Sequence, residues 1–229
     1  MTISKTPLPY LDSNLLFTVL PPAERSVISQ ASKVLTFSKQ QLIYEPGNDT
    51  TQAYILGKGT VKITIHAEKK DIIKYIVRPG TLFGEAFLTG ELQRRDYAYA
   101  MEDHTEVVVI EAQLMVSMMR RNFAFAQSLL YFLGERLRNT EIQLEKVMLK
   151  DSKSRILEYL HQMGIEQGKQ VGMEILVRHN MTHQDIADLT GTSRQMVTAV
   201  LNQLKRENLL YFSRKKILFR DLNALPAAS

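Results

Sequence analysis

Arg194 and Gln195 are the two side chains in this sequence whose types and position best suit recognition chemistry. They open an amphipathic pattern over residues 193–206, which predicts a helix with polar residues, Thr198 among them, on its outward face. Arginine can bond guanine through two hydrogen bonds, and glutamine can do the same to adenine. Because a helix fits the major groove of DNA with its first turn against the base edges, the pattern predicts sequence reading by these side chains.

Short polar residues and one glycine delimit this helix and a shorter one before it. We expect Thr182 to cap the first helix, with Asp185 returning a bond to the Thr182 backbone N–H. Gly191 supplies the freedom for a tight turn, and Ser193 is placed to cap the second helix. The buried faces are expected to consist of Ile186, Ala187 and Leu189 in the first helix and Met196, Val197, Val200, Leu201 and Leu204 in the second. The sequence thus predicts a helix-turn-helix.

A basic hairpin is predicted directly after the helix-turn-helix. Residues 209–220 hold two short apolar runs joined by a basic tip from Ser213 to Lys216, and Leu176 with Val177 upstream can add a third strand. Residues 193–220 carry seven Lys or Arg and one Glu, a net +6, which suits phosphate contact. The outline is that of a winged helix, and a helical hairpin with a solvated basic face is the alternative. The candidate DNA-binding residues are Thr182, His183, Ser193, Arg194, Gln195, Thr198, Arg214 and Lys215.

Composition narrows the class of protein. The 229 residues, 45% of them apolar, allow one large or two modest globular domains. The absence of cysteine excludes disulfides and cysteine-ligated zinc or iron–sulfur clusters. No apolar run is long enough to span a bilayer and no signal-peptide pattern opens the chain, so we expect a cytoplasmic protein. The net charge of +5 is mild and does not by itself indicate nucleic acid.

A second candidate site lies between residues 31 and 112, where short β-type runs alternate with glycines. Several strands with frequent turns predict a β-sandwich or rolled barrel. Within it, Gly84 followed by Glu85 offers free N–H groups and a carboxylate at the head of a short helix. Together with Arg95, these groups can hold a sugar phosphate. A glycine turn with surface charges is the alternative.

Residues 123–149 contain no proline and one glycine, and they predict a single long helix. Two apolar rows spaced by seven residues run along it, as in the a and d rows of a coiled coil. We therefore expect a homodimer, with packing on the helix's own domain as the alternative, and an interface that includes Leu130, Leu133, Leu137, Leu144 and Val147. A hinge at residues 151–154, a helix over 155–163 and a loop at 164–172 are expected to follow. The expected domains are residues 1–120, the long helix at 121–150, and residues 151–229.

Five short motifs lie in order along the chain: Tyr44-Glu-Pro-Gly47, Tyr54-Ile-Leu-Gly-Lys-Gly59, Pro79-Gly80 with Phe83-Gly-Glu85, Arg95, and Gly191-Thr-Ser-Arg-Gln-Met-Val197. From about residue 17 to residue 220, the chain resembles the Crp/Fnr family of bacterial transcription regulators, typified by the cyclic-AMP receptor protein and the fumarate–nitrate reductase regulator. The resemblance implies an α+β fold with an N-terminal cyclic-nucleotide-binding-type β-roll, a long dimerisation helix and a C-terminal winged helix-turn-helix. It also implies that the protein binds double-stranded DNA at a pseudo-palindromic site and that RNA polymerase is a second partner.

The resemblance assigns roles in the roll, and the chain departs from the family's pattern at two of them. By position, Gly84 matches the backbone turn of the family's cyclic-nucleotide pocket, and Glu85 matches its ribose-binding acid. Arg95 matches its phosphate-binding arginine, and Thr140 matches a hydroxyl residue that contacts adenine. Asp96 and Glu141 stand where the family places small hydroxyl residues. A carboxylate beside an anionic ligand costs about 1 to 4 kcal/mol. We therefore do not expect cyclic AMP as the ligand, and the effector is unknown or absent.

The sequence also argues against two other branches of the Crp/Fnr family. The iron–sulfur branch senses oxygen through cysteines, which this chain lacks. A haem is not expected either, because His66 and His104 show no partnering pattern. In the second helix, Arg194 matches the family's base-reading arginine, Gln195 replaces a common glutamate, and Ala199 stands where many members have a second arginine. The resemblance therefore implies an operator that shares only part of the family's half-site, with adenine preferred at the position read by Gln195.

A homodimeric, sequence-specific transcription regulator is the function that these observations favour, with an effector in the roll tilting the DNA-binding domains. A nucleotide-sensing module that regulates a protein partner is the second class, and the helix-turn-helix with its basic wing argues against it. An enzyme is the third. The sequence shows no Ser/His/Asp set, metal-ligand cluster or phosphate-cradling glycine loop, so catalysis is not expected.

Overall fold

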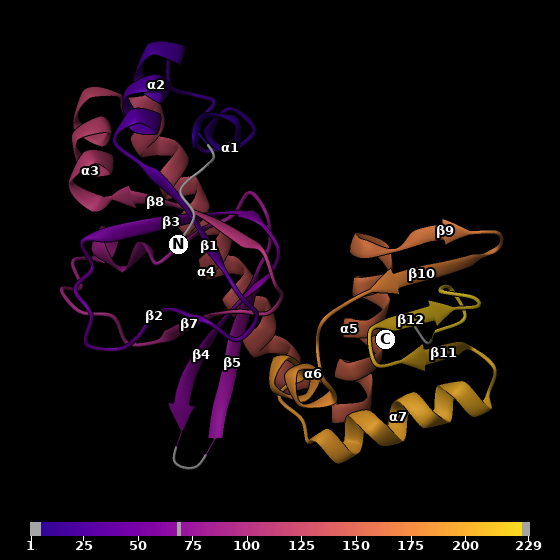
Figure 1. Cartoon of the computed structure of the whole chain (residues 1–229). Coiled ribbons are helices and arrows are strands. Elements are labelled where there is room, and N and C mark those ends of the chain that lie inside the picture. The colour runs from indigo at the N-terminus through magenta and orange to yellow at the C-terminus, as the bar shows by residue number, and fades with distance from the viewer. Residues whose placement is uncertain (1–5, 68–69, 226–229) are drawn as a thin grey trace. The chain divides into compact units, whose positions relative to one another are not determined.

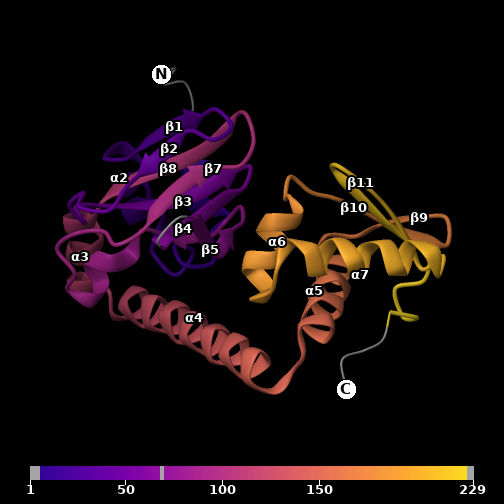
Figure 2. The same cartoon turned by 90° about the horizontal axis from the view of Figure 1, so that it is seen from below.

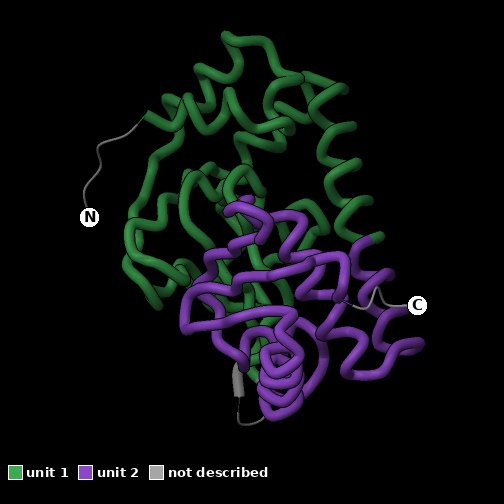
Figure 3. The backbone as a smooth tube through the Cα atoms, turned by 90° about the vertical axis from the view of Figure 1, so that its right-hand side faces the viewer, with its two compact units in different colours: residues 1–138 green, residues 139–229 purple. Residues whose placement is uncertain are grey.

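The structure of the chain is a computed structural model that describes residues 6–67 and 70–225. The chain divides into two compact units, residues 1–138 and 139–229, and the boundary falls within one long helix (Figure 3). Among the residues that the structure describes, no helix combines the length and the apolar character needed to cross a membrane.

The first unit is built on two four-stranded antiparallel sheets that pack face to face (Figure 1). One has the order β1-β8-β3-β6, with β1 at Lys33–Phe37, β3 at Gln52–Lys58, β6 at Leu82–Phe83 and β8 at Thr105–Glu111. The other has the order β2-β7-β4-β5, with β2 at Leu42–Tyr44, β4 at Val61–Ala67, β5 at Lys70–Val77 and β7 at Tyr97–Ala100. The β-roll predicted from the alternating runs and glycine turns is confirmed.

The first sheet is buried on both faces. Along β3, Tyr54 and Leu56 point into the core shared with the second sheet, whereas Ala53 and Ile55 point into a core shared with helices. Those helices are α1 (Leu8–Asp12), α2 (Pro22–Gln30), α3 (Ala112–Arg121) and the start of α4 (Phe123–Leu149). A strand that is covered on both sides needs apolar residues at successive positions, which explains the unbroken apolar run in β8.

Helix α4 runs without a break over the predicted range (Figure 2). Its first turns pack against its own unit, because Phe125 and Leu129 are buried in the core between the first sheet and the helices. The predicted leucine row is exposed: Leu130, Leu137 and Leu144 keep 65%, 61% and 60% of their surface accessible. The helix therefore has one side used within its own chain and one apolar side left uncovered.

The second unit combines three helices with a four-stranded antiparallel sheet of order β11-β12-β10-β9. Its elements after α4 are α5 (Ser152–Gln167), β9 (Lys169–Val171), β10 (Glu174–Arg178), α6 (His183–Thr190), α7 (Arg194–Arg206), β11 (Leu210–Ser213) and β12 (Lys216–Phe219). Helix α5 contacts β10, and α7 contacts β11. The predicted winged helix-turn-helix, including a third strand through Leu176 and Val177, is confirmed.

The loop predicted over residues 164–172 is wrong. Helix α5 continues to Gln167, and β9 follows as a strand that the exposed residues of that segment did not indicate. Gly164 lies inside the helix, and its small size is required there because a Cβ would come within 2.5 Å of the Leu222 side chain. The hinge predicted at residues 151–154 is shorter than expected, because α5 begins at Ser152 and only Lys150 and Asp151 separate it from α4. The Asp151 side chain caps α5 by accepting a hydrogen bond of 2.7 Å from Ser154 N.

Candidate nucleic-acid interface and effector site

The helix-turn-helix is fixed by local hydrogen bonds. A capping box starts α6: Thr182 Oγ1 accepts from Asp185 N at 3.1 Å, and Asp185 Oδ2 accepts from Thr182 N at 2.6 Å. Gly191 ends the helix with φ at 60°, a left-handed conformation that favours glycine. Ser193 Oγ then accepts from Met196 N at 3.1 Å and begins α7. Each of these predicted caps is confirmed.

Helix α7 separates a buried face from a polar one. Val197, Val200, Leu201 and Leu204 are buried as predicted, but the prediction for Met196 is wrong, because 40% of that residue is exposed. It lies at the edge of the buried stripe, where helical spacing gives no decisive signal. The exposed face holds Arg194, Gln195, Ala199 and Asn202. Asn202 was not among the predicted DNA-binding residues, although its position seven residues after Gln195 places it on that face.

His183 connects the start of α6 to the first turn of α7. Its Nδ1 lies 2.9 Å from Thr198 Oγ1, and that hydroxyl donates to Arg194 O at 2.9 Å. Since the Thr198 proton is used on the carbonyl, the shared hydrogen is assigned to His183 Nδ1. Burial lowers the pKa of His183, and the positive charge of Arg194 lowers it further, so the fold favours the neutral ring. The His183 ring and the Thr198 hydroxyl thus form a chain of two hydrogen bonds that ends on the Arg194 carbonyl.

The wing presents a group of exposed cations. Ser213 pairs with Lys216 in the β11–β12 hairpin, which leaves Arg214 and Lys215 at its two-residue tip. The carbonyl of Lys215 accepts from His179 N at 3.0 Å and so ties the tip to the end of β10. Arg178 pairs in register with Lys216, which adds a fourth exposed basic residue to the tip. Arg178 was missed because nothing in its own segment marks it as part of the wing. The four cations are suited to hold DNA phosphates.

In the first unit, the structure places Gly84 and Glu85 at the head of a short 3-10 helix, η1 (Glu85–Thr89). A Cβ at Gly84 would come within 2.7 Å of the Tyr54 ring, and φ there is 69°, so only glycine fits. Glu85 forms an ion pair with Arg136 of α4, whose guanidinium stacks 4.1 Å from the centre of the Tyr75 ring. Within the described residues, the other Glu85 oxygen is buried and accepts no hydrogen bond. Arg136 was missed because it lies far from Glu85 in sequence.

The neighbouring arginines of the roll point in opposite directions. Arg95 is directed outward, with 80% of its side chain exposed, and pairs with Glu91 at 3.1 Å rather than joining Glu85. Arg94 is buried, donates to Gly84 O at 3.2 Å and to Gln52 O at 2.5 Å, and lies 4.1 Å from the centre of the Tyr44 ring. Its guanidinium therefore supports the Gly84 turn from inside.

Three further residues of the effector hypothesis are Asp96, Thr140 and Glu141. Asp96 pairs with Lys74 at 2.6 Å, which neutralises its charge within the roll. Thr140 and Glu141 lie on the exposed surface of α4 in the second unit. Of the four candidate effector residues, the structure therefore brings Gly84 and Glu85 together at one turn, and in this arrangement Arg95 faces away from it.

Two family models match the sequence. Residues 34–122 match the cyclic nucleotide-binding domain, and residues 154–228 match the Crp-like helix-turn-helix domain. A global nitrogen regulator from Nostoc sp. is 26% identical over 186 residues, which cover 80% of this chain and 83% of that protein. A CRP-like cAMP-activated global transcriptional regulator from Mycobacterium tuberculosis is 24% identical over 211 residues, which cover 92% of this chain and 94% of that protein.

A solved structure shares the fold along nearly the whole chain. A CooA mutant from Carboxydothermus hydrogenoformans superposes with a TM-score of 0.75 at 24% identity, covering 93% of this chain and 94% of that one. The two matched models fall on the β-roll and on the winged helix-turn-helix, and the relatives span most of both chains. This chain therefore belongs to the Crp/Fnr family of helix-turn-helix transcription regulators that carry a cyclic-nucleotide-binding-type domain.

Proposed function

We propose that the protein regulates transcription as a homodimer that reads a pseudo-palindromic DNA site, with α7 in the major groove and the wing on phosphate. The observation that carries the proposal is the first turn of α7, where Arg194 and Gln195 are exposed while the opposite face is buried. This turn belongs to the same compact unit as the four cations of the wing tip. Together they supply both base-reading and phosphate-binding groups. Because the proposed ligand is DNA, we also propose that the protein is located in the cytoplasm.

The uncovered leucine row of α4 supports the dimer. Three leucines seven residues apart each expose more than half of their surface to water, which is costly for a side chain of this type. Leu133 is half-buried and Val147 is 52% exposed, so the second row offers apolar area as well. A second copy of the same helix covers both rows, and it would hold two recognition helices about 34 Å apart, one turn of DNA.

The exposed residues of α7 give the expected half-site. Arg194 bonds guanine, and Gln195 favours adenine at the base pair where a glutamate would select cytosine. Ala199 has no hydrogen-bonding group, so the base pair beneath it is read weakly or through a contact of its methyl group with thymine. The half-site therefore overlaps only partly with that of relatives that carry glutamate and arginine at these two positions.

We infer that the roll is controlled by a ligand other than cyclic AMP. The outward direction of Arg95 and the Lys74–Asp96 pair support this, since both cations are already paired with carboxylates of the roll. The buried, unbonded oxygen of Glu85 supports a ligand that donates a hydrogen bond there. Calorimetric titration of the protein with cyclic AMP tests the inference, and saturable binding would contradict it. A bound regulator of this type would act through RNA polymerase, and we assign the chain no catalytic activity.

The experiment that tests the function is selection of binding sites from random duplexes, followed by mobility-shift titration of the recovered sequence. We expect a two-fold symmetric site whose half-site centres are about 10 base pairs apart, bound with an affinity that falls steeply with salt. Recovery of asymmetric sequences, or binding that is indifferent to salt, would refute the proposal. The second outcome would instead favour a module that regulates a protein partner.

A further inference from the structure

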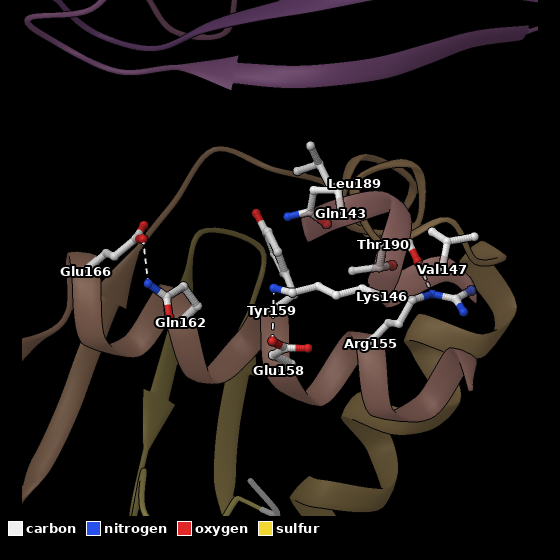
Figure 4. A pocket seen from close by; sticks show the side chains of 10 residues that line it. All are labelled: Gln143, Lys146, Val147, Arg155, Glu158, Tyr159, Gln162, Glu166, Leu189 and Thr190. Carbon is white, nitrogen blue, oxygen red and sulfur yellow. Dashed lines mark hydrogen bonds and ion pairs between the residues drawn. The ribbon is translucent and has the colours of Figure 1, made fainter. Parts of the chain in front are cut away.

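Arg155, near the start of α5, joins the ends of two other helices in the second unit. Its Nη1 donates to Lys150 O at 2.6 Å, next to the last turn of α4. Its Nε donates to Thr190 O at 2.8 Å (Figure 4). Its Nη2 donates to Gly191 O at 2.8 Å, also at the C-terminal end of α6. The last carbonyls of a helix have no partner within the helix and carry its negative dipole end. One guanidinium therefore satisfies two helix ends at once.

A pair of lysines fastens α4 to α5 beside this contact. Glu158 of α5 accepts from Lys146 at 2.9 Å through one oxygen and from Lys150 at 3.2 Å through the other. Figure 4 shows Glu158 directed at the Lys146 ammonium. The end of α4 is thus held by Glu158 and by the Arg155 guanidinium, which lie three residues apart on the same face of α5.

Apolar packing does not fill the space between these helices. A cavity of about 210 Å³ lies between α4, α5 and α6, with Gln143 and Val147 on one wall and Tyr159 and Leu189 on others (Figure 4). A close-packed core would fix the angle between α4 and the helix-turn-helix by contact alone. Here that contact is incomplete, so the angle depends on the polar contacts made by Arg155 and Glu158.

We propose that Arg155 sets the position of the recognition helix relative to α4, and through it the half-site spacing that the dimer accepts. The inference rests on the proposed dimeric DNA binding. Two of the three carbonyls held by Arg155, those of Thr190 and Gly191, belong to the turn that leads into α7, and the third, that of Lys150, follows the end of α4. A shift of the end of α4 therefore carries that turn with it. Arg155 is a positioning residue, because its side-chain groups are used on backbone carbonyls and not on DNA.

Arginine is needed for this arrangement. The guanidinium is planar and directs several N–H groups in fixed directions, whereas a lysine ammonium is one compact charge on a flexible stem. A lysine at this position cannot reach the carbonyls of Lys150, Thr190 and Gly191 simultaneously. Both Arg155→Lys and Arg155→Ala should therefore loosen the connection, and the lysine variant does so without a change of net charge.

The test compares the full-length protein, R155A, R155K and the matched control K153A on the selected DNA site. Lys153 is exposed, lies on the same first turn of α5, and its replacement removes one positive charge, as Arg155→Ala does. Each protein is titrated against the site and against sites with one base pair inserted or deleted at the centre. Such an insertion moves one half-site by about 3.4 Å and turns it by about 35°.

We expect the insertion to weaken binding by the unaltered protein and by K153A about tenfold or more, and binding by R155A and R155K by less than about threefold. Discrimination between bases inside the half-site should persist in all four. If both Arg155 variants keep the full spacing penalty, even with lower melting temperatures, Arg155 only stabilises the fold and the inference is overturned. Should R155A fail to fold, R155K decides the comparison. Failure of the unaltered protein to bind any two-fold symmetric duplex would instead remove the proposed function, and this inference with it.

Discussion

Replacement of Leu137 by alanine is expected to weaken the dimer strongly. Full burial of a leucine side chain is worth about 1.5–3 kcal/mol. In the single chain, 61% of Leu137 is exposed. Covering that fraction contributes about 1–2 kcal/mol per copy, and the row occurs in both copies. The substitution should therefore cost about 2–4 kcal/mol per dimer, which raises the dimer dissociation constant about 30-fold to 700-fold.

The measurement is sedimentation equilibrium over a range of concentrations, with mobility-shift titration of the two-fold symmetric site alongside. Leu149→Ala is the matched control, because Leu149 is 82% exposed on the same helix but lies outside the leucine row. Leu137→Ala should shift both the monomer–dimer midpoint and the DNA titration to higher protein concentration, and Leu149→Ala should shift neither. Equal effects of the two substitutions, or a parent protein that stays monomeric with DNA present, would refute a dimer formed through this row.

Four other substitutions have expected outcomes. Arg194→Ala should cost about 1–3 kcal/mol in specific binding and relax the base preference at one base pair. Gln195→Glu should change the preference at the neighbouring base pair from adenine to cytosine. Site selection measures both effects, and an unchanged base preference would exclude these roles. Arg214→Ala should weaken binding to all sequences alike and reduce the slope of log affinity against log salt by about 1, whereas an unaltered slope would place the wing tip away from phosphate. Burial lowers the pKa of His179, so the folded chain favours its neutral ring. The resulting stability is present above the ordinary histidine pKa of about 6.5 and is lost as the pH falls through the lower folded value. Thermal melts should show a smaller loss of stability on acidification for His179→Gln than for the parent, and equal losses would contradict this origin.

The features of the chain that could be predicted from sequence are those formed by near neighbours. Thr182 and Asp185 are three residues apart, and this spacing alone brings their side chains and backbone N–H groups together at a helix start. The long helix and its leucine row follow from periodicity in the same way. The loop over residues 164–172 was predicted wrongly, because Gly164 does not end helix α5. The small size of Gly164 is in fact required by contact with Leu222, which lies far along the chain.

The sequence by itself determined the helix-turn-helix, its caps, the basic wing tip and the apolar row of α4, because hydrogen bonds and periodicity over a few residues specify them. Only the tertiary structure decided which of two adjacent arginines in the roll points inward, since strand pairing and the aromatic rings of Tyr44 and Tyr54 select Arg94 and leave Arg95 outside. It also decided the partners of Glu85 and Arg155. A charged side chain pairs with the groups of opposite polarity that lie nearest to it in the folded chain. Those groups can be far away in the sequence, so the sequence around the charged residue does not identify them.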